Sequence, residues 1–262
     1  MATIITDIHT HILPGLDDGP KNAEEASALL TYLKTSGVER AFCTTHYLSP
    51  HFHVSQSDLA SGYANLSLIY HTLPSPALSA AAEVRLSPQL ETDLRDGNVP
   101  TLGSTKYVLV EFPGDDVSTD NLRLVYELQV RGYIPIMAHP ERNLGVQRNP
   151  SLIDELCDLG LTLQATADCF LKANTEMLTR DKIAWRFLEQ GRISLIASDA
   201  HNITSRPPTL VQAYERIGTR LGQSTVDQLI ENANAVWEGN PVEAVHVELV
   251  KRGLRGLFGQ KR

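Results

Sequence analysis

Histidine and carboxylate side chains are the residues of this chain whose types and spacing could carry out chemistry. They recur in short motifs along the sequence: DIHTH, TTH, AAEV, VLVE, IMAHPER and SDAH. Imidazole and carboxylate groups together suit zinc, manganese or iron, and several carboxylates can bridge two ions. The candidate ligands are five histidines and three carboxylates, namely His9, His11, His46, Glu83, Glu111, His139, Asp199 and His201. One such residue would be weak evidence, but the whole set favours metal binding.

Two arginines stand close to these motifs. Arg142 follows His139 by three residues, and Arg206 follows His201 by five. Guanidinium groups suit bidentate recognition of phosphate and can neutralise charge that develops in a transition state. The alternative explanation is that both arginines form surface salt bridges, which contribute little to folding stability. The nearness of both arginines to the metal motifs favours phosphate as the substrate group.

Two other polar clusters are less specific. Asp17–Asp18–Gly19 is typical of a turn, because Asp and Gly are turn formers, but either aspartate could be a further metal ligand. His51 and His53 form a second H-x-H pair after Pro50, and we interpret them as loop residues. Contact of this loop with substrate is the alternative.

The cysteines argue against a thiol nucleophile. A cysteine-dependent phosphatase needs an arginine six positions after its cysteine, at the end of the loop that cradles phosphate. The chain has Cys43, Cys157 and Cys169, and the positions six residues later hold Ser49, Leu163 and Thr175. Three scattered cysteines also offer no disulfide framework, which fits a reducing compartment.

The elements that must position these residues alternate along the chain. Short apolar runs alternate with amphipathic segments, the pattern of βα units. Strands are predicted at residues 4–8, 40–44, 78–83, 107–111, 134–138, 161–165 and 193–197. Helices are predicted at residues 23–36, 57–73, 119–131, 181–190, 209–221 and 225–234, between Ser87 and Gly97, and between Asn149 and Gly160.

The candidate residues lie at or just after the ends of these strands. In a parallel (β/α) barrel the carboxyl ends of all strands meet at one face, where such enzymes place their sites. The length of 262 residues suits one such barrel. We therefore predict one domain over residues 1–238, followed by a peripheral tail over residues 239–262.

Charge and hydropathy restrict the partners. The net charge of −8 disfavours nucleic acid. No run approaches the length of a membrane span, and no basic region precedes the first apolar run, so we expect a cytoplasmic protein. The tail is locally basic, with Lys251, Arg252, Arg255, Lys261 and Arg262. We interpret it as a solvated end, the alternative being a weak contact with anionic lipid or an acidic partner.

At these motifs the chain resembles the polymerase-and-histidinol-phosphatase (PHP) superfamily. It is most similar to the bacterial manganese-dependent protein-tyrosine phosphatases found with capsule and exopolysaccharide synthesis. The matching stretches are DIHTHILPGLDDGP, TTH, AAEVRL, KYVLVEFP, GYIPIMAHPERN and ASDAHN with SRPP, so the resemblance runs from Asp7 to Pro208. It implies a distorted seven-stranded (β/α) TIM-like barrel, the PHP fold.

The resemblance also implies a site and a reaction. Three divalent metal ions are implied, with manganese expected and iron or zinc as alternatives. The implied ligands are His9, His11, Asp18, His46, Glu83, Glu111, His139, Asp199 and His201, with Arg142 and Arg206 binding phosphate. We expect metal-activated hydroxide to attack phosphotyrosine in line, without a phosphoenzyme. The expected substrate is a phosphotyrosine-bearing protein, a tyrosine autokinase that regulates polysaccharide synthesis.

Two alternatives stay open from the sequence, and a third, an amidohydrolase, is disfavoured. A small-molecule phosphatase, such as a histidinol-phosphate phosphatase, would use the same metals. A non-catalytic, metal-bound regulator of the kinase would keep the ligands without turnover. An amidohydrolase would commonly need a lysine that bridges its metals on the fourth strand, where this chain has Glu111.

Overall fold

All seven predicted strands form, and they make one parallel sheet. The computed structural model describes residues 3–70, 74–115 and 117–247. The strands pair in chain order as β1 (Thr6–Thr10), β2 (Arg40–Tyr47), β3 (Ala77–Arg85), β4 (Tyr107–Glu111), β5 (Ile134–Ala138), β6 (Thr162–Thr166) and β7 (Leu195–Ala197). A parallel bridge between Thr10 and Ala200 brings the last strand back to the first. The sheet is thus a nearly closed barrel, and the predicted fold class is confirmed.

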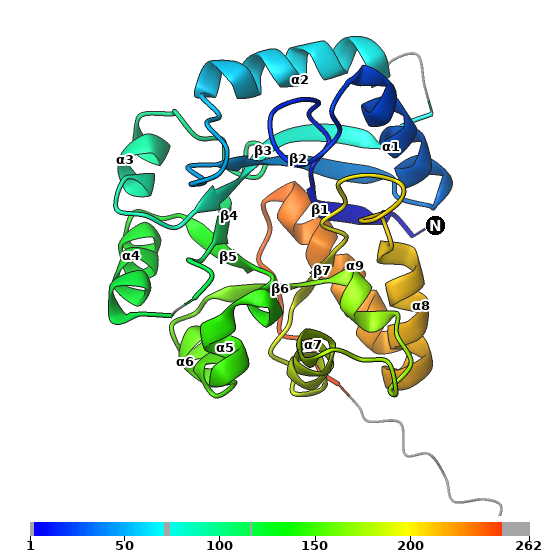
Figure 1. The fold of residues 1–262 in the computed structure, drawn as a ribbon. Coiled ribbons are helices and arrows are strands. Elements are labelled where there is room, and N and C mark those ends of the chain that lie inside the picture. Colours follow the sequence, from blue (N-terminus) through cyan, green and yellow to red (C-terminus); the bar gives the residue numbers. More distant parts are fainter. Residues whose placement is uncertain (1–2, 71–73, 116, 248–262) are drawn as a thin grey trace, which may run out of the picture.

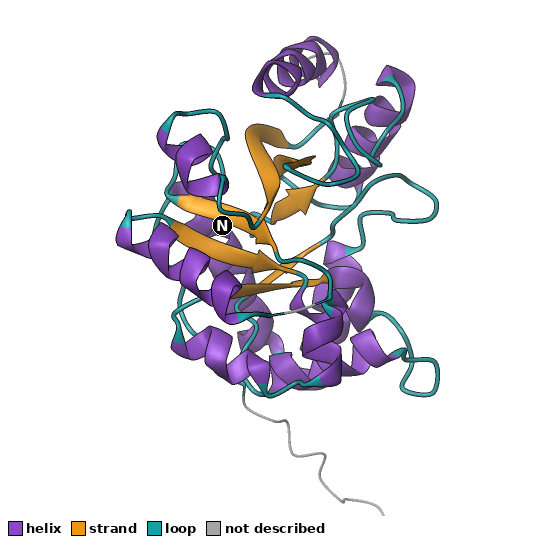
Figure 2. Cartoon of the chain, turned by 60° about the vertical axis from the view of Figure 1, so that its left-hand side comes forward, coloured by secondary structure: helices purple, strands orange, loops and turns teal. Residues whose placement is uncertain are grey.

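Most helices surround the strands on the outside (Figures 1 and 2), whereas the last one, at residues 223–238, contributes Ala233 and Val236 to the core inside the barrel. The helices are α1 (Ala23–Thr35), α2 (Gln56–Tyr70), α3 (Leu90–Arg95), α4 (Thr119–Val130), α5 (Leu144–Arg148), α6 (Leu152–Asp158), α7 (Thr179–Glu189), α8 (Leu210–Leu221) and α9 (Gln223–Glu238). Residues 71–73 of the helix predicted at 57–73 lie outside the described residues. Three short helices were not predicted: α5 and the 3₁₀ turns η1 (Pro140–Arg142) and η2 (Ala167–Phe170). Both 3₁₀ turns come directly after a strand end.

Helix α1 shows how local sequence builds the outer layer. Asn22 caps the helix by accepting a hydrogen bond from the backbone N–H of Glu25, at 3.0 Å. Acidic residues in the first turn complement the helix dipole. One face of α1 is buried, and its residues are those that the 3.6-residue period predicts: Ala26, Leu29, Leu30 and Leu33.

The hydrophobic core has two parts, one between the strands and the outer helices and one inside the barrel. The inner part explains how the strands aim side chains into the barrel mouth. Side chains two positions apart on a strand share a face. The residue two positions after an inner-core residue therefore also points into the barrel, but nearer its mouth. Two such pairs are Ala81 and Glu83 in β3, and Leu109 and Glu111 in β4.

The chain after α9 lies against the barrel in its described part. Tyr107 Oη donates to the carbonyl of Asn240 at 2.7 Å, and Asn232 makes two hydrogen bonds with the backbone of Glu243. Val245 is only 3% exposed. The basic residues of the expected tail all lie outside the described residues, and the division of the chain at residue 239 stays a prediction. No helix of the described chain is long and apolar enough to cross a membrane.

Candidate metal centre

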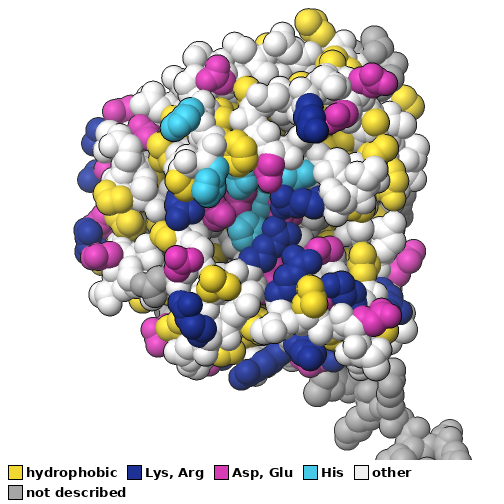
Figure 3. All heavy atoms as spheres, in the orientation of Figure 1, with side chains coloured by type: hydrophobic (Ala, Val, Ile, Leu, Met, Phe, Trp, Pro, Cys, Tyr) yellow, Lys and Arg dark blue, Asp and Glu magenta, His cyan; other side chains and the backbone are white. Residues whose placement is uncertain are grey.

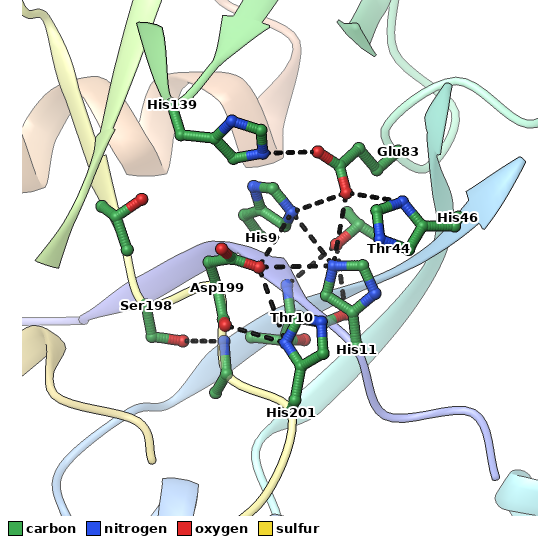
Figure 4. A network of polar contacts seen from close by, with 12 residues as sticks. His9, Thr10, His11, Thr44, His46, Glu83, His139, Ser198, Asp199 and His201 are labelled. Atoms are coloured by element: carbon green, nitrogen blue, oxygen red, sulfur yellow. Dashed lines mark hydrogen bonds and ion pairs between the residues drawn. The ribbon is translucent and has the colours of Figure 1, made fainter. Parts of the chain in front are cut away.

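The structure brings all nine sequence-predicted ligands together at the barrel mouth. Figure 4 shows imidazole and carboxylate groups from separate strands pointing toward one another. His9 Nε2 and His11 Nε2 are 3.2 Å apart, so both rings of the first H-x-H pair face this cluster. The ligand atoms fall into four overlapping groups, each within 4.8 Å: His11, Asp18, His46 and His201; His9, His11 and Asp199; His9, Glu83 and His139; and His46, Glu83 and Glu111.

Glu83 lies among four of the histidines. Its Oε1 is 2.8 Å from His139 Nε2, and its Oε2 is 3.0 Å from His46 Nδ1. The same Oε2 is 3.3 Å from His9 Nε2 and 3.4 Å from His11 Nε2. Burial alone would raise the pKa of this carboxyl, but the histidines hold its pKa well below the usual range. An ionised carboxylate among imidazole groups is a suitable ligand for divalent metal ions.

Asp199 connects the cluster to both predicted phosphate-binding arginines. Its Oδ2 is 2.6 Å from Arg142 Nη1 and 2.7 Å from Arg206 Nη2. Burial opposes ionisation, but His9 and the two arginines hold the pKa of Asp199 well below its usual value. Two guanidinium groups, from the segments that follow β5 and β7, therefore converge at one carboxylate oxygen.

Two residues of the cluster have left-handed backbones. His139 has a φ of 34° and Asp199 a φ of 52°, a region that residues with a Cβ rarely adopt. Each follows the end of a strand, β5 and β7 respectively, where the chain turns sharply. Such strain persists where the surrounding structure over-determines it, and it is concentrated at functional sites.

The structure separates the two aspartates that the sequence left open. Asp17 Oδ2 is 2.7 Å from His11 Nδ1 and accepts the backbone N–H of His46 at 3.0 Å. Asp18 Oδ1 is instead 3.0 Å from His201 Nε2, and only Asp18 is in one of the four groups. Asp17 therefore holds the His11 ring through its Nδ1, whereas Asp18 faces the cluster of candidate ligands.

Other histidines are also held by their second ring nitrogen. His9 Nδ1 is 2.9 Å from the side-chain oxygen of Gln164 in β6, and His201 Nδ1 is 2.9 Å from the carbonyl of Asp199. A ring N–H that donates to such an oxygen leaves Nε2 free as a ligand and fixes the ring orientation. Gln164 was not predicted. Its signal was a lone amide in the otherwise apolar strand segment LTLQA.

Glu141 is a second residue that the sequence analysis missed. It is fully buried next to Arg142, and its Oε1 accepts the backbone N–H of Thr166 at 2.9 Å. It thereby ties the turn after β5, which carries Arg142, to the end of β6. Asp168, which follows β6, is in none of the four groups and pairs with Arg180 at 2.7 Å.

Two cavities open in front of the cluster. The first, of about 230 Å³, is lined by residues that include His139, Arg142 and Arg206. The second, of about 510 Å³, lies beside it, because His46, Glu111 and Gly114 line both. Figure 3 shows histidine and acidic side chains gathered in this hollow, with Lys and Arg side chains beside them. His51 lines the second cavity, whereas His53 is exposed and does not.

The donor set fits divalent metal ions. Glu83 Oε2 and His201 Nε2 are buried and meet no partner in hydrogen-bond geometry, although His46 Nδ1 and Asp18 Oδ1 are each only 3.0 Å away. Buried polar atoms left this way are expected where a cation completes the site. The groups contain imidazole and carboxylate and, over the described residues, no thiolate, a combination that suits manganese, iron or zinc.

Relatives of this chain are named tyrosine phosphatases. The family model for capsular polysaccharide synthesis, CpsB/CapC, matches residues 5–238. The tyrosine-protein phosphatase YwqE of Bacillus subtilis is 31% identical over 255 residues, which cover 97% of this chain and 98% of that protein. The tyrosine-protein phosphatase CpsB of Streptococcus pneumoniae is 28% identical over 235 residues, 85% of this chain and 93% of that protein.

Solved structures agree with this relationship. A structure from the work on YwqE of Bacillus subtilis and CpsB of Streptococcus pneumoniae, described as metal-dependent tyrosine phosphatases, superposes with a TM-score of 0.85. It is 29% identical, and the match covers 95% of this chain and all of that one. An inactive dihydroorotase-like domain of Chaetomium thermophilum has a TM-score of 0.55 at 10% identity, which reflects the barrel fold alone. The chain belongs to the CpsB/CapC family of capsular polysaccharide synthesis.

Proposed function

We propose that this protein is a metal-dependent protein-tyrosine phosphatase, a phosphoric monoester hydrolase of capsule or exopolysaccharide synthesis. The observation that carries the proposal is the convergence of nine side chains that could ligate metal ions and of two arginines at one barrel mouth. Relatives that match nearly the whole chain are named tyrosine-protein phosphatases, and a solved relative is described as metal-dependent. These names favour this reading over a histidinol-phosphate phosphatase and over a non-catalytic regulator.

The four overlapping groups would hold three divalent ions, for which we propose manganese. His9, His11, His46 and Glu83 each belong to two of the four groups, so the groups would form one continuous cluster rather than separate sites. Divalent ions in such a site lower the pKa of a coordinated water from about 15.7 toward neutrality and stabilise charge on phosphoryl oxygens. The protein's own contribution is to fix the ligands, through Asp17 on His11 and Gln164 on His9.

Arg142 and Arg206 would bind the phosphoryl group of the substrate. Both pair with Asp199, and Arg206 also contacts Asp18 Oδ2 at 3.1 Å. Both line the first cavity, so a phosphoryl group that enters it meets their guanidinium donors. The hydrogen bonds from these donors would become stronger as negative charge builds on the phosphoryl oxygens in the transition state. The phenolate of tyrosine has a pKa of about 10, so it can leave without a strong general acid.

The proposal also names the protein substrate and the compartment in which the reaction would occur. The substrate would be the phosphotyrosine of a bacterial tyrosine autokinase, and the protein would act in the cytoplasm, where such phosphorylation occurs. The basic residues after position 250 would contribute at most a weak contact with membrane or with an acidic partner. The support for this setting is the capsular-synthesis family of the chain and the named activity of its relatives.

A substrate panel tests the proposed reaction. Purified protein with added manganese would be given a phosphotyrosine peptide, the same peptide with phosphoserine, and histidinol phosphate. We expect the phosphotyrosine peptide to have the highest kcat/KM. A preference for histidinol phosphate would assign the barrel to small-molecule chemistry. Metal-loaded protein that turns over none of the three would favour the non-catalytic regulator.

A further inference from the structure

The second cavity has an aromatic wall that the metal cluster does not explain. Phe52 lies on the loop between β2 and α2, and its ring is parallel to that of His46, with centroids 5.4 Å apart and an angle of 7° between the rings. Phe52 is half-buried and lines the cavity of about 510 Å³. Pro50 and Pro113 line the same cavity from two separate loops. Three apolar side chains thus face one space beside a strongly polar centre.

This cavity continues the space in which the arginines lie. His46, Glu111 and Gly114 line both cavities, so they form the border between them. A phosphoryl group held by Arg142 and Arg206 is in the first cavity, beside the histidines. The group esterified to that phosphoryl can then extend across the border into the second cavity.

We propose that Phe52, with Pro50 and Pro113, forms a subsite for the aromatic ring of an aryl phosphate. The proposal rests on the proposed function and deepens it, because it names the part of the site that distinguishes phosphotyrosine from phosphoserine. Aromatic rings pack well against other aromatic rings in offset or tilted geometry and against apolar side chains. The single methylene of phosphoserine offers no such surface, so the subsite would not contribute to the binding of phosphoserine.

The rest of the second cavity suits a peptide that carries the ring. His51, Arg85 and Asp115 also line it, and Arg85 Nη1 is 3.9 Å from Oε2 of Glu111, its partner on the neighbouring strand β4. These polar side chains stand where the backbone or neighbouring residues of a substrate would lie. The cavity therefore combines three apolar side chains with polar ones, as expected of a site for a tyrosine within a polypeptide.

The test compares binding of phenylphosphonate and methylphosphonate to the manganese-loaded protein by calorimetry. Neither ligand is hydrolysed, so binding is measured independently of turnover. We expect the wild-type protein to prefer phenylphosphonate, and Phe52→Ala to weaken its binding about tenfold, since aromatic packing contributes on this order. Methylphosphonate binding should change less than about twofold, because it reaches only the first cavity. Phe52→Tyr should retain the phenyl preference.

A control variant, together with the effect of Phe52→Ala on each ligand, distinguishes binding of the phenyl ring by Phe52 from mere support of His46. His53→Ala changes an exposed residue of the same loop that does not line the cavity, and both ligands should bind as in the wild type. Equal weakening of both ligands in Phe52→Ala would mean that Phe52 only supports His46, and would overturn the proposal. So would a wild-type protein without phenyl preference. Failure of the proposed function would appear separately, as phenyl preference without hydrolysis of a phosphotyrosine peptide.

Discussion

Asp17 Oδ2 lies 2.7 Å from His11 Nδ1, on the side of the imidazole away from the other candidate ligands. Burial disfavours a charged imidazole, but the Asp17 carboxylate outweighs it and raises the pKa of His11 well above its ordinary value. The same carboxylate accepts the backbone N–H groups of Gly19 and His46. Asp17 therefore connects the loop after β1, the ring of His11 and the end of β2.

Replacement of Asp17 should weaken metal binding without removing a ligand. Asp17→Asn keeps the shape of the side chain but loses the charge that orients and polarises His11. We expect manganese affinity to fall by about 10- to 100-fold, as for other carboxylates behind a ligating histidine. Calorimetric titration of the metal-free protein measures this. Asp120→Asn, at an exposed carboxylate of α4, is the control, and unchanged affinity in Asp17→Asn would refute the orienting role.

The two arginines should resist even conservative replacement. Arg206→Lys and Arg142→Lys keep the positive charge but lose the planar fork that binds two phosphoryl oxygens. We expect kcat/KM for a phosphotyrosine peptide to fall by about 10²- to 10³-fold, mostly in kcat, because these contacts strengthen in the transition state. Arg123→Lys, on the exposed face of α4, should have no effect. Near-normal kcat in both lysine variants would leave only a surface role for these arginines.

Thiol alkylation should leave the enzyme active. Burial raises the pKa of Cys43 to about 12, and burial together with neighbouring carboxylates raises the pKa of Cys169. A raised thiol pKa lowers the thiolate fraction at pH 8, and the thiolate is the reactive form. Iodoacetamide at pH 8 should therefore leave activity unchanged, while protein unfolded in urea is labelled at all three cysteines. Inactivation in step with labelling of Cys169 would point to thiol chemistry instead.

The segment after α9 should contribute to folding stability. Val245 is 3% exposed and packs with the outer core, so Val245→Ala removes buried methyl groups. We expect the free energy of unfolding to fall by roughly 2 kcal/mol. Val130→Ala, at a residue 66% exposed on α4, should change it by less than about 0.5 kcal/mol. Urea denaturation of the two variants measures both values, and equal stability would mean that this segment is peripheral.

The strands and the candidate ligands could be predicted because they obey local rules. A period of two along a strand places Glu83 and Glu111 on the inner face above Ala81 and Leu109, and strand ends of a parallel barrel meet. Strand boundaries were less accurate. β2 extends to Tyr47, so His46 lies within the strand rather than after it. Such boundaries depend on pairing with neighbours, here on the full register between β2 and β3.

The parts that escaped prediction depend on tertiary structure. Asp17 and Asp18 are adjacent and chemically alike, and only the path of the loop after β1 decides which of them faces the cluster. Gln164 and Glu141 act through hydrogen bonds to residues distant in sequence. Phe52 is an ordinary apolar residue in the sequence, and its proposed role can be inferred only from its position beside the ring of His46.

Metal dependence of phosphotyrosine hydrolysis tests the central claim most directly. Protein stripped with a chelator would be assayed on a phosphotyrosine peptide while manganese is titrated back and bound metal is counted by mass spectrometry. We predict no turnover without metal, and recovery that follows occupancy up to three ions per chain. Full turnover in protein shown to be metal-free would contradict the account.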